Sequence, residues 1–478
     1  MNRSSLAKSG LWATYGAVAT RLLALVSNLF LARLLLPSEF GVIGITYIFW
    51  AFGNLFMQDT IASFIAYKGT EDKRLLNTAY TIGLGIGVIL ALGLIALSPL
   101  IAQFFGIPAL MGLLMIFAFN LVLSAVQTSY AGVLMRQLQH QELANATVLA
   151  SLVRVGVTVG CATQGFSYWS FAIGDTAYWL TACVLTKRQV KHSFRLEIAP
   201  HARQEVMTYC LGATGSSLGY YLNANFDNFT IAKLLGSTSL GHYNLAYQLT
   251  MSLTTMLSQA IGQVATSAFA QLSDEAQRQL LVRLIERIAF LSAPVYALSY
   301  LLLNPWVITV VFGKVWLPML PVIPWLLVFA YFRLLNSPLL CMLAAKGKPG
   351  INAKVNLCIA PLAVLSFVIG AQTKGIVGVS IAVALVLGII WTVYWWWTGC
   401  RQFGWSLPQF LIPCFQPALF AIGAVVLAQQ TPVPIQPVVL ISIYLGVVRL
   451  IVPHQLALYS LLLNRLSQKI VALWHRKS

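Results

Sequence analysis

The segment LARLLLPSEFG at residues 31–41 is nearly repeated two hundred residues later by IAKLLGSTSLG at residues 231–241. At a constant offset of 200, two leucines and the final glycine recur, and Lys233 takes the place of Arg33. A second pair relates PLIAQFFG, from residue 99, to PWVITVVFG, from residue 305. Self-similarity at a fixed spacing indicates a duplicated unit of about 200 residues, whose junction then falls near the middle of the chain. The alternative is a chance resemblance between leucine-rich segments.

The composition around this repeat is typical of a membrane protein. Hydrophobic residues make up 59% of the 478 positions and charged residues only 9%, which leaves too few polar groups to cover a soluble domain of this size. Apolar runs of about 20 residues, each able to cross a hydrocarbon core of roughly 30 Å as a helix, follow one another with short polar interruptions. We expect fourteen spans, near residues 10–35, 40–67, 78–105, 109–135, 143–164, 168–186, 206–235, 240–271, 280–312, 318–345, 352–371, 376–400, 407–428 and 437–452.

The distribution of lysine and arginine predicts the orientation of these spans. If the N-terminus is inside, most of the 30 lysines and arginines fall in the inside tails and loops, and only Arg33, Lys233, Lys314 and Lys374 lie at the outside ends. Inside loops of membrane proteins retain an excess of these residues. The first run is too long for a signal peptide and contains an arginine. We therefore expect a multi-pass protein of the cytoplasmic membrane with both termini in the cytoplasm.

The net charge of +18 does not indicate a nucleic-acid-binding protein. The cations lie beside the anionic headgroups of the inner leaflet, and no folded basic domain is predicted that could bind a duplex. The last segment, residues 453–478, places its apolar side chains on one helical face and is predicted to lie as an amphipathic helix on the inner membrane surface. Membrane lipids are expected partners, and nucleic acids are not.

The sequence lacks the motifs of several kinds of catalytic and binding site. The seven cysteines are scattered, without a CxxC pair or a histidine at ligand spacing, which argues against a metal or redox site. No GxxxxGK[ST] loop is present to bind a nucleotide. No large loop outside the membrane is available to form a soluble catalytic site. The sequence therefore predicts neither an enzyme nor a cofactor.

The spans and the repeat together predict an all-α integral membrane fold of two related lobes. Each copy would contain six helices, and an even number gives the copies the same orientation, related by an axis along the membrane normal. We expect an N-terminal lobe at residues 1–195, a cytoplasmic linker at 196–205, a C-terminal lobe at 206–400, two additional spans at 401–452 and the amphipathic tail at 453–478.

Six segments, some of which overlap the repeat, together resemble the sequences of one group of transporters. They are ARLLLPSEFG (32–41), LLNTAY (75–80), LSPLIAQFFGIP (97–108), GFSYWSFAIG (165–174), FGKVWLPMLP (312–321) and RLLNSP (333–338). In these segments the chain resembles the Wzx-type polysaccharide flippases of the multidrug/oligosaccharidyl-lipid/polysaccharide exporter superfamily. The resemblance covers roughly residues 7–400. It departs from the family at MQDTIAS (57–63), where no glycine follows Asp59, and this weakens any role for that carboxylate.

The resemblance implies a bilobed transporter of the bacterial inner membrane that acts in cell-surface polysaccharide biosynthesis. Its implied cargo is an undecaprenyl-diphosphate-linked oligosaccharide, moved from the cytoplasmic to the outer leaflet by alternating access. The resemblance also implies polysaccharide assembly proteins as possible partners of a monomeric transporter.

Phosphates and sugars are excluded by hydrocarbon, so such a cargo requires a polar cavity with fixed cations. Arg21, Arg154 and Arg333 lie within predicted spans. Each would cost roughly 2.5 to 3.5 kcal/mol at the centre of an inserting helix, so we expect all three to face inward and to be candidates for substrate binding.

Three acidic residues, Asp59, Asp175 and Asp227, also lie within predicted spans. Structural ion pairs between these acids and the three arginines are the alternative to substrate binding, and an ion-coupling role for the acids is a further one. The sequence favours substrate contact for Arg21. Arg33 and Lys233 are expected to be architectural, because a cation at a helix end complements the helix dipole.

Two other functions share part of this pattern. An ion-coupled multidrug exporter of the same superfamily would have the same fold, but its cationic substrates favour an acidic cavity, whereas embedded arginines favour an anionic cargo. A membrane-embedded polysaccharide polymerase would need a large outer loop with catalytic residues, and the predicted outer loops are short.

Overall fold

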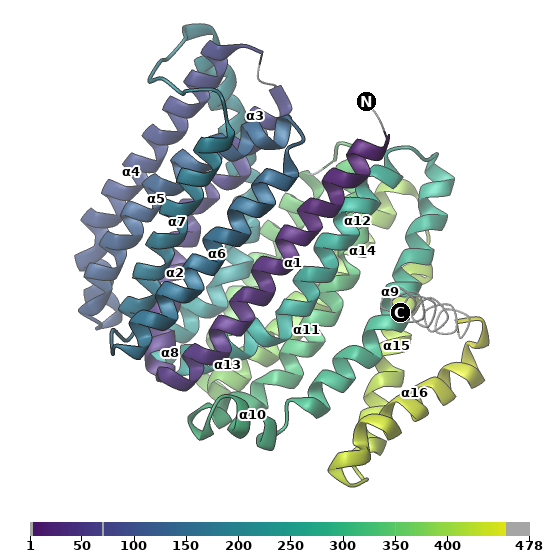
Figure 1. The fold of residues 1–478 in the computed structure, drawn as a ribbon. Coiled ribbons are helices and arrows are strands. Elements are labelled where there is room, and N and C mark those ends of the chain that lie inside the picture. Colours follow the sequence, from purple (N-terminus) through teal and green to yellow (C-terminus); the bar gives the residue numbers. More distant parts are fainter. Residues whose placement is uncertain (1–2, 69–70, 349, 456–478) are drawn as a thin grey trace, which may run out of the picture.

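The computed structural model is a bundle of long helices whose connections lie alternately at its two ends (Figure 1). It describes residues 3–68, 71–348 and 350–455. We call the end at which α1 begins, at the top of Figure 1, the basic end, because the connections there carry most of the lysines and arginines; the opposite end is the distal end.

The helices of the first lobe begin and end at local signals in the sequence. Asp72 caps α4 by accepting hydrogen bonds from the backbone N–H groups of Arg74 and Leu75, at 2.8 and 3.2 Å. Gly106 ends the same helix with a φ of 69°, a conformation that favours glycine. The bounds are α1 (Arg3–Leu34), α2 (Pro37–Leu55), a π-helical segment (Gln58–Ala62), α3 (Ser63–Lys68), α4 (Lys73–Phe105), α5 (Ala109–Arg136), α6 (His140–Thr163) and α7 (Trp169–Gln189).

An extended connection at residues 190–199 leads to the second lobe. Its first element, α8 (Pro200–Phe269), turns at Gly236, whose φ is 83° and ψ 174°, so it consists of two helices. The rest of the lobe comprises α9 (Asp274–Leu302), α10 (Pro305–Val311), a 3₁₀ segment (Lys314–Val322), α11 (Ile323–Leu335), α12 (Ser337–Ala345), α13 (Gly350–Ala382), a π-helical segment (Val383–Ile390) and α14 (Trp391–Phe403).

Two further long helices, α15 (Pro408–Ala428) and α16 (Gln436–Ile451), pack beside α9 (Figure 1). Short 3₁₀ turns at Val433–Ile435 and Pro453–Gln455 precede and follow α16. Most of the amphipathic tail predicted at residues 453–478 lies outside the described residues.

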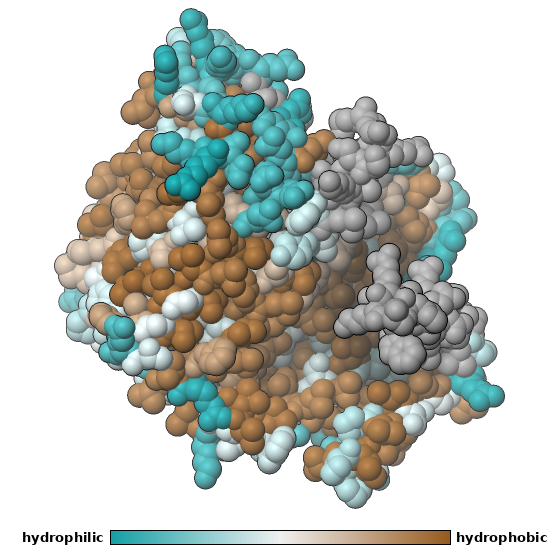
Figure 2. Space-filling view, in the orientation of Figure 1, coloured by the Kyte–Doolittle hydropathy of each residue, from teal (hydrophilic) through white to brown (hydrophobic). Residues whose placement is uncertain are grey.

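Within the described residues, nine helices are long and apolar enough to cross a membrane, or ten if α9 and α10, bent by 71°, form one broken span. This count takes Gly350–Phe403 as one helix, although α13 turns at Gly375, where φ is 60°. It also leaves out α7 and both parts of α8, which are more polar. With these segments the helices match the fourteen expected spans. Figure 2 shows a broad apolar band between more hydrophilic ends, as a membrane-embedded surface requires.

The two lobes meet closely where α2 and the second part of α8 pack together at the distal end. A Cβ atom added to Gly41 would lie 1.7 Å from the carbonyl oxygen of Ser237, and one added to Gly241 would lie 1.8 Å from that of Pro37. The two contacts are related by the 200-residue offset of the repeat. Only glycine permits such an approach of two backbones. The predicted fold class, an all-α membrane protein, is confirmed.

The beginning of α8 packs on the first lobe rather than on the second. Val206 and Cys210 belong to a small buried cluster with Ile61, Phe64 and Leu76. Further along the same helix, Asn223 donates hydrogen bonds of 3.0 Å to the backbone and side-chain oxygens of Asn356 on α13. α8 therefore passes from one lobe to the other within its first part.

Candidate functional site

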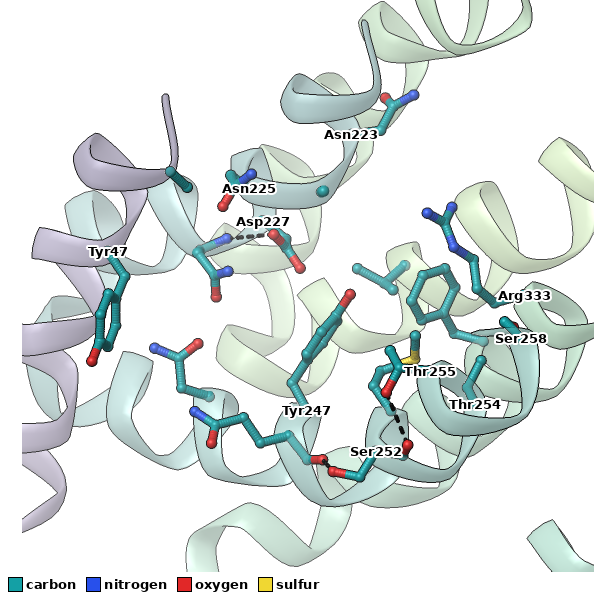
Figure 3. Close-up of a pocket in the computed structure, with 18 of the residues that line it drawn as sticks. Tyr47, Asn223, Asn225, Asp227, Tyr247, Ser252, Thr254, Thr255, Ser258 and Arg333 are labelled. Carbon is teal, nitrogen blue, oxygen red and sulfur yellow. Dashed lines mark hydrogen bonds between the residues drawn. The ribbon is translucent and has the colours of Figure 1, made fainter. Parts of the chain in front are cut away.

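A cavity of about 950 Å³ lies between the two lobes. Its walls come from α1, α2, α6 and α7 of the first lobe and from α8, α11, α12, α13 and α14 of the second. The lining is rich in carboxamide and hydroxyl groups, several of which are shown in Figure 3. Arg21, Arg154 and Arg333 all line it, so the structure brings the three predicted arginines to one cavity.

Arg333, on α11, has no acidic partner among the described residues. Its guanidinium carbon lies 5.1 Å from the ring centroid of Tyr220 and 5.9 Å from that of Trp391, which are cation–π distances. Figure 3 shows the guanidinium pointing away from its own helix, toward the space that Asp227 and Tyr247 also face. The aromatic rings hold the cation in place and leave its N–H donors available.

Arg21 lies near the middle of α1 and is exposed at the cavity. No hydrogen-bond or ion-pair partner for it is found in the part of the chain that the structure describes. Because a guanidinium carries five donors and no acceptor, an unpaired one in a polar cavity is suited to an anionic ligand.

Arg154 has a different environment. It forms an ion pair with Asp175 on α7, and its Nη2 atom donates a hydrogen bond of 2.8 Å to the hydroxyl of Tyr47. The same hydroxyl donates to Asp175 at 2.7 Å. These three residues join α2, α6 and α7, which favours the structural ion-pair alternative for Arg154 and Asp175.

Asp227 lines the cavity but is itself buried, and among the described residues it has no cationic partner. It accepts a hydrogen bond from the hydroxyl of Tyr243 at 2.6 Å. It also accepts one from the backbone N–H of Asn228 at 2.7 Å, which is drawn in Figure 3. Asp59 lies on the π-helical segment, and its side chain is outside the described part of the structure. No group of three or more histidine, cysteine or acidic residues in the described ranges could hold a metal ion.

Several lining residues were not found from the sequence. Tyr47, Tyr247 and Trp391 line the cavity, and Trp391 donates a hydrogen bond of 3.2 Å to the side-chain oxygen of Asn356. Aromatic residues in apolar spans carry no signal that separates a cavity wall from a helix interface. Two further lining residues have buried polar atoms without a hydrogen-bond partner among the described residues, namely Asn228 Oδ1 and the indole N–H of Trp395. The sequence does not indicate which polar atoms lack a partner.

The two lobes contact each other at the distal end. The indole N–H of Trp316 donates a hydrogen bond of 2.8 Å to the carbonyl oxygen of Ala32, and the ring of Trp316 packs edge-on against Phe40 at 5.1 Å. Two related helical lobes around a polar central cavity define a membrane transporter.

Comparison with known proteins gives the family. The family model for polysaccharide biosynthesis proteins matches residues 30–321, and the chain belongs to this family. It is therefore a membrane transport protein of polysaccharide biosynthesis, as the sequence segments predicted. The chain is 24% identical to the lipopolysaccharide biosynthesis protein WzxC of Escherichia coli (strain K12), over 87% of this chain and 86% of that protein. It is 22% identical to the teichuronic acid biosynthesis protein TuaB of Bacillus subtilis (strain 168), over 78% of each chain.

Solved structures show the same fold at low sequence identity. The lipid II flippase MurJ, in an inward closed conformation, superposes with a TM-score of 0.72 and 13% identity, over 92% of this chain and 98% of that chain. An inward-facing multidrug resistance transporter of the MATE family superposes with a TM-score of 0.61 and 16% identity, over 80% and 94% of the two chains.

Proposed function

We propose that this protein flips undecaprenyl-diphosphate-linked oligosaccharide units from the cytoplasmic to the outer leaflet of a bacterial inner membrane. The observation that carries the proposal is the central cavity, in which Arg21 and Arg333 have no acidic partner among the described residues. Two relatives are named as lipopolysaccharide and teichuronic acid biosynthesis proteins, which supports a polysaccharide precursor as the cargo.

The two parts of such a cargo match two kinds of lining group. A diphosphate is recognised best by guanidinium groups, because their N–H donors pair with two phosphate oxygens at once. Sugar hydroxyls both donate and accept hydrogen bonds, as do the carboxamides of the lining, and buried polar atoms without a protein partner, such as Asn228 Oδ1, are expected where a ligand or water binds. At about 950 Å³, the cavity is at the upper end of the range of small-molecule sites.

The proposed mechanism is alternating access. In the proposed orientation the basic end faces the cytoplasm, because inside loops retain lysine and arginine. In this proposal the contacts between the lobes at the distal end close the cavity from the outside, as the state before release of the cargo requires. Release requires the lobes to separate at the distal end.

The competing function, an ion-coupled multidrug exporter, has less support from the cavity. Cationic drugs favour an acidic cavity, but the described acid in the lining, Asp227, is buried and accepts hydrogen bonds from Tyr243 and Asn228. Two guanidinium groups without acidic partners would repel a cation.

The test is deletion of the gene in its host, followed by isolation of the lipid-linked oligosaccharide. We expect the precursor to accumulate on the cytoplasmic side of the membrane, and the intact gene to reverse this. Precursor that still reaches the outer leaflet at the normal rate in the deletion strain, with no second transporter gene able to replace it, would contradict the proposal.

A further inference from the structure

Two basic residues at the distal end reach from one lobe to the other. Arg33, near the end of α1, donates through Nε to the carbonyl oxygen of Val311 at the end of α10, at 2.7 Å. Lys233, before the turn in α8, donates through Nζ to the carbonyl oxygen of Phe104 in the last turn of α4, at 2.8 Å. Its Nζ atom also lies 3.8 Å from the centroid of the Phe104 ring.

The two contacts are equivalent under the internal repeat. Arg33 and Lys233 are separated by the same 200-residue offset as Gly41 and Gly241. Their acceptors are equivalent as well, because Phe104 and Val311 each stand two positions before the glycine of the matching PLIAQFFG and PWVITVVFG segments. Each lobe therefore donates one equivalent hydrogen bond to the other lobe.

The acceptors suit a cation. The last carbonyl groups of a helix have no intrahelical donor and carry the negative end of the helix dipole, so a charged donor satisfies them better than a neutral one. The arrangement differs from the anchoring role expected from the sequence, since each cation bonds the end of a helix in the opposite lobe rather than its own helix.

We propose that Arg33 and Lys233 form a pair of equivalent distal latches that hold the distal end shut and must release before cargo can leave. The inference rests on the alternating access of the proposed function. A contact between lobes exists only while they are together, so its free energy favours the closed state alone and sets how often the distal end opens. A contact within one lobe, or with lipid headgroups, would favour neither state.

The experiment measures how often the distal end opens. The seven native cysteines are replaced, Leu240→Cys is introduced as a reporter, and the protein is placed in lipid nanodiscs. Leu240 is fully buried, and its side chain lies close to Gly44 between the lobes, so a water-soluble thiol reagent reaches it only when this end opens. If reclosing is fast, the rate of labelling is proportional to the open fraction.

We expect Arg33→Gln and Lys233→Gln each to raise the labelling rate by about three- to tenfold, the range for one exposed hydrogen bond to a charged group. Their effects should be similar in size, and the double variant should show roughly their product, since the latches are separate. Arg33→Lys, which keeps the charge, should lie between the parent and Arg33→Gln. The matched control is Lys314→Gln, because Lys314 is an exposed distal lysine without a partner among the described residues.

Labelling rates in both single variants and the double variant equal to that of the Lys314→Gln control would overturn the proposal. An effect of one latch residue without the other would overturn their equivalence. The measurement requires neither substrate nor a defined membrane orientation. An incorrect assignment of the cargo would therefore appear in the deletion experiment and leave the labelling rates unchanged.

Discussion

The three arginines inside the bundle differ in what surrounds them, and this decides what each can do. Arg154 is bound to Asp175 and Tyr47, so its positive charge is already paired with a carboxylate. Arg333 is held between aromatic rings that take none of its hydrogen bonds, and Arg21 stands at the cavity without a partner among the described residues. We therefore propose that Arg21 and Arg333 are the residues of the cavity that bind an anion.

The first prediction concerns the ion pair. Arg154→Ala leaves Asp175 in a site where 9% of its side chain is exposed, while 33% of the Arg154 side chain is exposed in the intact pair. A fully buried pair broken on one side costs about 3 to 5 kcal/mol, so we expect this partly exposed one to cost about 1 to 3 kcal/mol of the free energy of unfolding. Thermal unfolding of the purified protein in detergent measures the loss.

A double-mutant cycle controls for the loss of side-chain volume. Asp175→Asn alone and together with Arg154→Ala should reveal a coupling energy of about 1 to 3 kcal/mol. Strictly additive losses would show that the two charges do not stabilise each other, and would return Arg154 to the candidates for substrate binding.

The sequence predicted which arginines lie in spans, but not their partners. Arg154 and Asp175 are 21 positions apart on different helices, and Tyr47 comes from a third. Which of six embedded charges pair depends on how the helices are rotated against each other, and that is set by packing rather than by any spacing in the sequence.

At the scale of elements, the connection between the lobes is a docked segment of extended chain. The side chain of Asn77 on α4 donates to Glu197 at 3.0 Å, and its oxygen accepts from the backbone N–H of Arg195 and contacts Nε2 of His192, both at 3.2 Å. The ring of Phe194 stacks on that of Tyr80 at 4.8 Å. We therefore expect residues 190–199 to stay with the first lobe if the lobes move relative to each other.

The second prediction is a pH dependence of this docking. Partial burial, together with the nearby charge of Lys73, holds the pKa of His192 below its ordinary value of 6.5. The docked state thus favours neutral His192. Its contribution to docking is fully present above the ordinary pKa of 6.5, and it is lost as the pH falls through the lowered pKa of the docked state. We expect trypsin cleavage at Lys191 and Arg195, normalised to a reference peptide, to rise several-fold between pH 7.5 and 5.5.

The matched control is His192→Gln, which keeps a hydrogen-bond donor but cannot be protonated. This variant should lose the part of the pH dependence that His192 contributes and keep any part due to other groups. A cleavage profile identical to that of the parent chain would show that His192 does not govern the docking.

The elements were predictable where hydropathy alone decides them. The apolar runs predicted where the helices lie, and the similarity at an offset of 200 residues predicted the repeat, because both follow from patterns along the chain. The turn in α8 at Gly236 falls between the expected spans 206–235 and 240–271. The π-helical segments were not predicted, since such irregularities arise from contacts between helices. The contact of Arg33 with Val311 could not be predicted from the sequence either, because its acceptor is a backbone carbonyl, which every residue has.

At the scale of the whole molecule, the third prediction is the orientation in the membrane. In a background without native cysteines, Lys314→Cys or Lys374→Cys should react with an impermeant thiol reagent added outside intact cells. Arg195→Cys and Lys348→Cys should react only after the membrane is opened, because inside loops retain the positive charges. The opposite pattern would reverse the proposed orientation.

The central claim is that the guanidinium groups of the cavity bind the diphosphate of a lipid-linked oligosaccharide, and substitution of Arg21 tests it most directly. The measurement is flipping of this substrate in proteoliposomes, normalised to detergent-stable protein, for the parent chain and for Arg21→Lys, Arg21→Ala and Arg333→Ala. Arg401→Ala is the control, because Arg401 lies over Trp397 on the exposed surface of α14, outside the cavity.

We expect Arg21→Ala and Arg333→Ala to reduce flipping per folded molecule at least about tenfold, since each removes charge-assisted hydrogen bonds to phosphate. Arg21→Lys should keep part of the activity, because it retains the charge but loses the two-pronged hydrogen bonding. Arg401→Ala should flip at the parent rate. Flipping at the parent rate per folded molecule in both alanine variants of the cavity would contradict the account.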